Sequence, residues 1–139
     1  MRRIIFISVL ALMGCESTGQ PRLQPTGPAP VTPGVTEPVQ LSDAQLKNIQ
    51  SAVMNSLKDP DSAKFGEIKG AKSEGMGADL ITVCGWVNAR NSFGGYTGMS
   101  PFMALYSIGA HKSDIVKMGG EEMVNFQIQN RCLAHGVRI

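Results

Sequence analysis

The residues of this chain that could take part in chemistry are three cysteines, two histidines and one polar, glycine-rich stretch. Cys84 and the only tryptophan lie in the run VCGWVNARNSFGGYTG (83–98), where an apolar segment gives way to polar residues and glycines. This run could form a catalytic loop, a ligand cradle or a strand that leads into a turn. The choice depends first on whether Cys84 is a free thiol, and therefore on the compartment in which the protein folds.

The first cysteine, Cys15, ends the N-terminal run MRRIIFISVLALMGC. Two arginines precede a short apolar core, which falls well below the roughly 20 apolar residues of a permanent membrane span. Such a start is typical of an export signal. The last four residues, LMGC, resemble the lipobox of bacterial lipoproteins, which implies cleavage before Cys15 and a diacylglycerol lipid on its sulfur. The alternative is an ordinary signal peptide in which this cysteine occurs by chance.

The lipobox resemblance also implies a location. Residues 1–14 would be a signal peptide, and Glu16 is not the aspartate that typically retains Gram-negative lipoproteins in the inner membrane. We therefore expect an anchor in the cell outer membrane, with the domain facing the periplasm. The two or three acyl chains implied by the lipobox suffice for stable anchoring. Without Arg2 and Arg3 the basic and acidic residues are equal in number, so nucleic acid is not an expected partner.

Residues 15–40 are expected to form the lipidated N-terminus and a proline-rich linker. Six of the eight prolines lie in this segment, and such a composition cannot bury enough apolar surface to offset the entropy of ordering the chain. Proline favours an extended chain that gains about 3.1 Å per residue, so the linker would hold a domain away from the lipid. A docking motif for a proline-binding partner is the alternative.

Residues 41–139 are long enough for one domain with a single modest core. Its start is marked by Ser42 and Gln45, which have the spacing of a capping box. Apolar residues at positions 46, 49, 53 and 57 then recur at helical spacing. They predict a helix that ends near Lys58, because Pro60 disfavours helix at the residue before it.

Four segments beyond this helix are predicted strands: residues 65–72, 79–90, 102–106 and 114–118. The second strand has apolar residues on both alternating faces, which indicates a central strand covered on both sides. A C-terminal helix is expected from about Glu121 to Ala134, with Gly136 as its C-cap. The predicted fold class is therefore α+β, with an N-terminal helix, a small antiparallel sheet of three to four strands and a C-terminal helix.

No motif in the chain indicates an enzyme. The run DPDS (59–62) holds two aspartates that could suggest a cation site, but no further acids follow at the spacing of a metal-binding loop, and a turn is favoured. The cysteines and histidines lack the paired short spacings of a zinc site. Neither a phosphate-binding loop motif nor a nucleophile-elbow serine occurs. We therefore expect no metal, no cofactor and no catalysis.

Cys84 and Cys132 remain once Cys15 is assigned to lipid. An exported protein meets an oxidising compartment, where two cysteines usually pair. A disulfide is therefore expected between the central strand and the last helix. The alternative is a cysteine nucleophile with His111 or His135 as its base, since His135 follows Cys132 by three residues.

Two ordered motifs support a family resemblance. The runs LKDPDSAKF (57–65) and VCGWVNARNSFGGYTG (83–98) resemble a family of small, mostly uncharacterised proteobacterial and phage-associated exported proteins. The family pattern is KDPxSAxF followed by VCGxVNA(K/R)NxxGGYxG. A cysteine near the C-terminus, here Cys132, also fits the family, which supports the disulfide. The resemblance implies a fold and no particular reaction.

Three interpretations of NARNSFGGYTG (88–98) remain. It could be a hairpin connection, in which Gly94 and Gly95 supply positive φ angles and Phe93 and Tyr96 pack beside them. It could also be a phosphate cradle, although the following lysine and helix start are missing.

The third interpretation is a binding surface. Asn88, Arg90, Asn91 and Tyr96 offer amide, guanidinium and phenol groups, which suit an envelope protein or peptidoglycan as the partner. The expected function is a binding or accessory module of the cell envelope. An inhibitor or regulator of an envelope enzyme, such as a lysozyme-like hydrolase, is the alternative.

Overall fold

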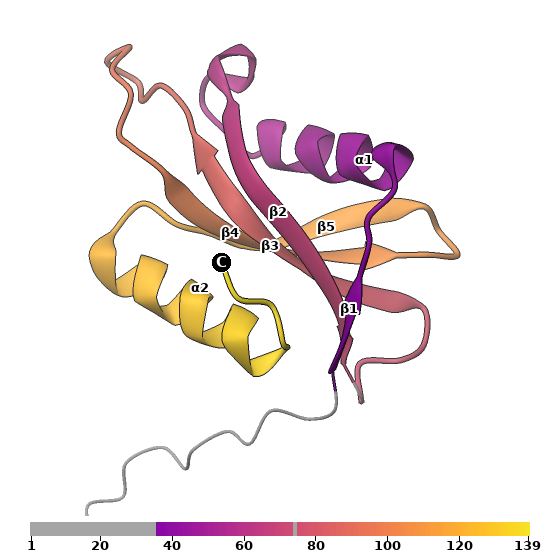
Figure 1. The fold of residues 1–139 in the computed structure, drawn as a ribbon. Helices are drawn as coiled ribbons and strands as arrows, with labels where there is room; N and C mark the ends of the chain where they lie inside the picture. The colour runs from indigo at the N-terminus through magenta and orange to yellow at the C-terminus, as the bar shows by residue number, and fades with distance from the viewer. Residues whose placement is uncertain (1–35, 74) are drawn as a thin grey trace, which may run out of the picture.

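Five strands form one antiparallel sheet with the spatial order β1–β2–β3–β4–β5, so each strand pairs with its neighbour in the sequence (Figure 1). The computed structural model describes residues 36–73 and 75–139. The strands are β1 (Thr36–Val39), β2 (Lys64–Ser73), β3 (Leu80–Asn88), β4 (Ser100–Ser107) and β5 (Lys112–Met118). Two α-helices, α1 (Asp43–Met54) and α2 (Glu122–Ala134), and a 3-10 turn (Pro60–Ser62) complete the described fold. The α+β class predicted from the sequence is confirmed.

The two helices cover opposite faces of the sheet. On one face, Ile49 and Val53 of α1 belong to a buried cluster that includes Val83 of β3. On the other face, Ile128 and Cys132 of α2 are buried in a second cluster. Neighbouring residues of β3 therefore enter different clusters, and the prediction of a central strand covered on both sides is confirmed.

The capping box at the start of α1 is present as predicted. The backbone N–H of Gln45 donates to Ser42 Oγ at 3.3 Å, and the backbone N–H of Ser42 donates to Gln45 Oε1 at 2.8 Å. The helix ends at Met54, earlier than the expected end near Lys58. Beyond Met54 the backbone hydrogen bonds join residues that are three apart in the sequence instead of four. This tighter winding ends the helix.

The sheet has five strands where three to four were expected, and the additional strand is β1. Its residues belong to the segment 15–40, which was expected to be linker throughout. Instead, Thr36 to Val39 pair with Ser73 to Gly70 of β2. Pro38 is tolerated because β1 is an edge strand, where a missing N–H need not interrupt a ladder. The predicted signal peptide, Cys15 and the remaining linker lie outside the described residues.

A disulfide joins Cys84 of β3 to Cys132 of α2, with an S–S distance of 1.98 Å. Both cysteines are fully buried. The bond fastens α2 to the centre of the sheet. Because a sulfur in a disulfide cannot act as a nucleophile, the cysteine–histidine alternative finds no support in this arrangement.

Candidate functional site

The loop between β3 and β4 is held in one conformation by its own backbone and by Asn91. Asn91 Oδ1 accepts hydrogen bonds from the backbone N–H groups of Phe93 (3.0 Å) and Gly95 (3.1 Å). The N–H of Asn91 also donates to Gly95 O at 2.9 Å, and the N–H of Gly94 donates to Asn91 O at 2.9 Å. We call residues 89–99 the hairpin loop.

Glycine is required in the hairpin loop at two places. Gly94 and Gly98 have φ angles of 81° and 93°, in the left-handed region that side chains disfavour. The sequence prediction of positive φ is confirmed at Gly94 but was wrong at Gly95. The position missed was Gly98, whose N–H donates to Asn88 Oδ1 at 3.2 Å.

The base of the hairpin loop is fixed by Ser62, which comes from the other sequence motif. The N–H of Arg90 donates to Ser62 Oγ at 2.8 Å, and Tyr96 Oη donates to Ser62 O at 3.2 Å. Ser62 Oγ itself donates to Asp59 O at 2.8 Å, within the 3-10 turn that begins at Pro60. The expected turn at residues 59–62 is thus confirmed. The two motifs, 26 residues apart in their first positions, contact each other and form one structural unit.

Two cations lie against the Tyr96 ring. Lys64 Nζ is 4.5 Å from the ring centroid, and Arg90 Cζ is 5.4 Å from it. Both distances are within the range of favourable cation–π contacts. These contacts place two positive charges at the base of the hairpin loop. A hollow of about 210 Å³ adjoins Arg90, with Lys58 among its lining residues.

Phe93 lies at the tip of this loop and is 96% exposed. The sequence prediction that it packs beside the glycines was wrong, because the bonds to Asn91 direct the backbone so that Phe93 has no neighbours to cover it. Of the four predicted binding residues, three hold the loop with their side-chain oxygens: Asn88 and Asn91 accept from backbone N–H groups of the loop, and Tyr96 Oη donates to Ser62 O in the 3-10 turn. Arg90 contributes its backbone N–H and holds its guanidinium near Tyr96. Their contact with a partner stays a prediction, to which Phe93 is now added.

A carboxyl group held by two hydrogen bonds lies at the opposite end of the sheet from the hairpin loop. Asp79 accepts hydrogen bonds from Ser107 Oγ and from the N–H of Gly109, both at 2.7 Å. These two bonds, the one from Ser107 first, lower the pKa of the Asp79 carboxyl. They tie the start of β3 to the turn after β4, so the role of Asp79 is structural.

Within residues 36–73 and 75–139, no group of three or more His, Cys, Asp or Glu side chains could hold a metal ion. In the same part of the chain, no helix is long and apolar enough to cross a membrane. No protein-family model, curated protein or solved structure matches the chain. A proposal for function therefore depends on the geometry of the hairpin loop and on the N-terminal sequence.

Proposed function

We propose that this protein is a lipid-anchored binding or accessory module of the bacterial envelope, and that the hairpin loop is its contact surface. One observation carries the proposal. An 11-residue loop with no large buried side chain is nevertheless tied down at its base, middle and tip, and it displays a fully exposed aromatic ring. A connection that only joined two strands would need neither feature.

The position of the loop in the domain agrees with this role. β1 pairs with the C-terminal end of β2, whereas the hairpin loop follows the end of β3 that pairs with Lys64, the first residue of β2. The chain therefore enters the sheet at one end and the loop projects from the other (Figure 1). At about 3.3 Å per residue, β2 separates the two ends by roughly 30 Å. A tether that starts at Cys15 would attach at Thr36, so it would leave the hairpin loop free for a partner.

The chemistry of the loop favours a neutral or acidic partner surface. Between Asp79 and Asp114 the chain contains no acidic residue, and Arg90 and Lys64 flank the aromatic ring of Tyr96. Because the backbone of the hairpin loop is already held, Phe93 loses little backbone freedom on binding, which is a property of an interface anchor. An envelope protein with an apolar pocket, or the carboxylate-bearing peptides of peptidoglycan, would suit this surface.

The second candidate is an inhibitor or regulator of an envelope enzyme, such as a lysozyme-like hydrolase. The convex, preorganised hairpin loop favours it, since such a loop can enter the concave cleft of an enzyme. Both candidates use the same residues. Assays of a purified hydrolase with the wild-type protein and with Phe93→Ser distinguish the two candidate functions, because only an inhibitor would lower hydrolysis in a Phe93-dependent way.

Photo-crosslinking in cells tests the contact surface. A photo-reactive amino acid at Phe93 replaces a side chain without neighbours, and the same group at Lys112, on the opposite end of the sheet, is the matched control. We expect a discrete crosslinked species from position 93 and none from position 112. Equal products from both positions, or none from position 93, would refute the proposed surface.

The lipid anchor requires its own test. Metabolic labelling with a fatty-acid probe should mark the wild-type protein and leave Cys15→Ser unmarked. Unchanged labelling of the variant would refute the anchor, while the crosslinking result would stand independently.

A further inference from the structure

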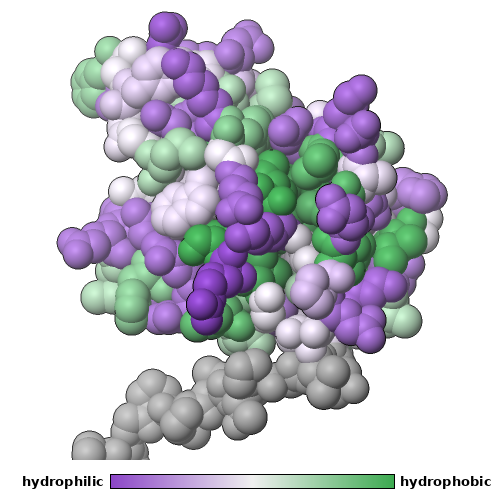
Figure 2. Space-filling view, in the orientation of Figure 1, coloured by the Kyte–Doolittle hydropathy of each residue, from purple (hydrophilic) through white to green (hydrophobic). Residues whose placement is uncertain are grey.

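A groove of about 660 Å³ lies on the side of β2 that faces away from β3. One wall is formed by the chain from β1 into α1, with Leu41 and Leu46. The other wall is the segment after α2, residues 136–138, and the floor is β2 from Glu67 to Gly70. In Figure 2 a strip of hydrophilic residues runs through the middle of this face, with hydrophobic residues beside it. We call this cavity the β2 groove.

The floor of the β2 groove, apart from Gly70, is a strand edge without a partner strand among the described residues. β1 pairs only with Gly70 to Ser73 of β2. The preceding residues 64–69 bond to β3 on one side, and within the described part of the chain no backbone bond reaches them from the other side. An edge of this kind presents backbone N–H and C=O groups to whatever enters the groove. The hydrogen-bonding chemistry of such an edge is satisfied by another extended chain.

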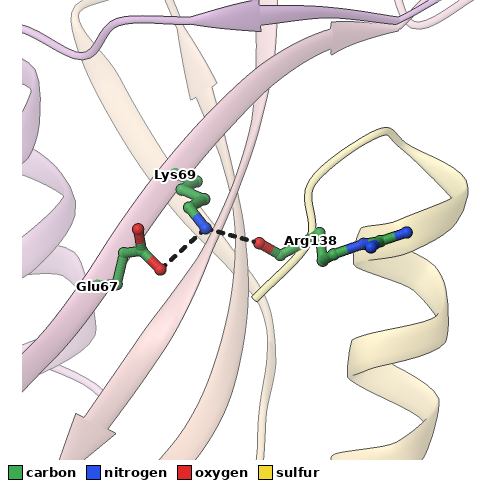
Figure 3. A network of polar contacts seen from close by, with 3 residues as sticks. All are labelled: Glu67, Lys69 and Arg138. Carbon is green, nitrogen blue, oxygen red and sulfur yellow. Dashed lines mark hydrogen bonds and ion pairs between the residues drawn. The ribbon is translucent and has the colours of Figure 1, made fainter.

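The side chains on the floor of the β2 groove are apolar on one face of the strand and charged on the other. Ile68 packs with Leu41 against the cluster under α1, so one side of the floor is apolar. Glu67 and Lys69 lie on the other side, where Lys69 Nζ is 2.9 Å from Glu67 Oε2 and donates to Arg138 O at 3.0 Å (Figure 3). The Arg138 guanidinium points away from both residues in Figure 3 and forms no ion pair with the described residues.

We propose that the β2 groove binds an extended peptide segment of a partner protein by strand addition. The segment continues the position of β1 along β2, antiparallel to β2. Its alternate side chains are aliphatic, toward Leu41 and Ile68, and its opposite face carries a carboxylate, toward which the exposed Arg138 guanidinium turns from its position in Figure 3. The unpaired stretch of β2 admits a segment of about 20 Å, or six residues, at strand spacing.

A second copy of this chain is a poorer occupant of the β2 groove. Walls stand on both sides of the exposed strand edge, and a sheet edge from a second copy would bring its own α1 and C-terminal segment against them. β2 also has a bulge between Phe65 and Ile68, and charged Glu67 and Lys69 lie next to it. Both features disfavour pairing between two folded sheet edges. This site is independent of the hairpin loop, so either proposal can fail alone.

NMR titration of the full mature chain tests the proposal. The probes are synthetic peptides of six residues that alternate glutamate with valine, leucine or threonine, added up to millimolar concentration. We expect shift changes at residues 39–41, 67–70 and 137–138, and slower amide exchange within residues 65–69. Matched peptides N-methylated at alternate residues should bind at least tenfold more weakly, because the ladder bonds are lost. Arg138→Gln should weaken binding about threefold, and the remote control Lys112→Gln should not.

Four results would overturn strand addition. One is the absence of shift changes in this groove with every peptide. Another is equal binding of the N-methylated peptides, which would mean apolar adhesion without backbone pairing. The third is a set of concentration-dependent shifts at residues 64–70 without peptide, which would assign the groove to a second copy. Shift changes confined to residues 89–99 would place the peptide on the hairpin loop and likewise contradict this proposal.

Discussion

Substituting Ser62 by alanine should loosen the hairpin loop, although Ser62 lies far from this loop in the sequence. Ser62 is 8% exposed, and its hydroxyl joins Arg90 N and Asp59 O, each at 2.8 Å. Alanine keeps the local backbone geometry and removes only the oxygen. The N–H of Arg90 then loses its partner where the hairpin loop begins.

The size of the effect follows from the two lost bonds. A hydrogen bond in a folded protein contributes about 0.5–1.5 kcal/mol, so Ser62→Ala should lower the free energy of unfolding by about 1–3 kcal/mol. For a domain of this size, that corresponds to a Tm lower by roughly 5–15 °C. Ser56→Ala is the matched control, because its exposed hydroxyl bonds to Ala52 O at the end of α1. It should change the free energy of unfolding by less than about 0.5 kcal/mol.

Urea denaturation gives the free energy, and amide hydrogen exchange shows where the change occurs. In Ser62→Ala we expect faster exchange at Arg90, Asn91 and Gly95, with little change in α2. If Ser62→Ala were as stable as Ser56→Ala and the loop amides exchanged at wild-type rates, the claim that the two motifs form one structural unit would be wrong.

Three further predictions concern the rest of the domain. Replacing both Cys84 and Cys132 by alanine should cost about 4 kcal/mol in urea denaturation, given the 48-residue separation of the cysteines; an unchanged midpoint would contradict this. Because Ser107 lowers the pKa of Asp79, the carboxylate stabilises the fold above the unfolded pKa of about 3.9, and this contribution is lost as the pH falls through the lower folded pKa. The stability difference between wild type and Asp79→Asn should therefore shrink between pH 5 and pH 2, and a constant difference would refute the assignment. Phe93→Ser should leave the free energy of unfolding within about 0.5 kcal/mol of wild type, and a larger loss would mean that the ring has a structural role.

Local patterns in the sequence predicted most of the fold. The capping box at Ser42 and the apolar residues of α1 depend on neighbours within one or two turns, and both are confirmed. The two-sided pattern of β3 predicted its central place in the sheet. β1 could not be predicted in this way, because Pro38 and Glu37 resemble linker and the pairing with Gly70 to Ser73 is non-local.

The candidate site was predicted only in part, for a similar reason. The glycines at 94 and 95 indicated a turn, and the polar residues around them indicated a surface. The contact between Ser62 and Arg90 spans 28 residues, so spacing alone could not reveal it. The exposure of Phe93 depends on the hydrogen bonds to Asn91, and the pattern of apolar residues in the sequence does not predict such bonds.

The central claim is that the hairpin loop is a rigid contact element and not merely a connection between β3 and β4. Backbone ¹⁵N relaxation of the protein tests it most directly, because an exposed, glycine-rich loop is otherwise expected to move on the nanosecond timescale. We predict order parameters of about 0.8 or more at Asn91, Gly95 and Gly98, close to those of the strands, and lower values in Ser62→Ala. Order parameters below about 0.6 at these residues in the wild-type protein would contradict the account.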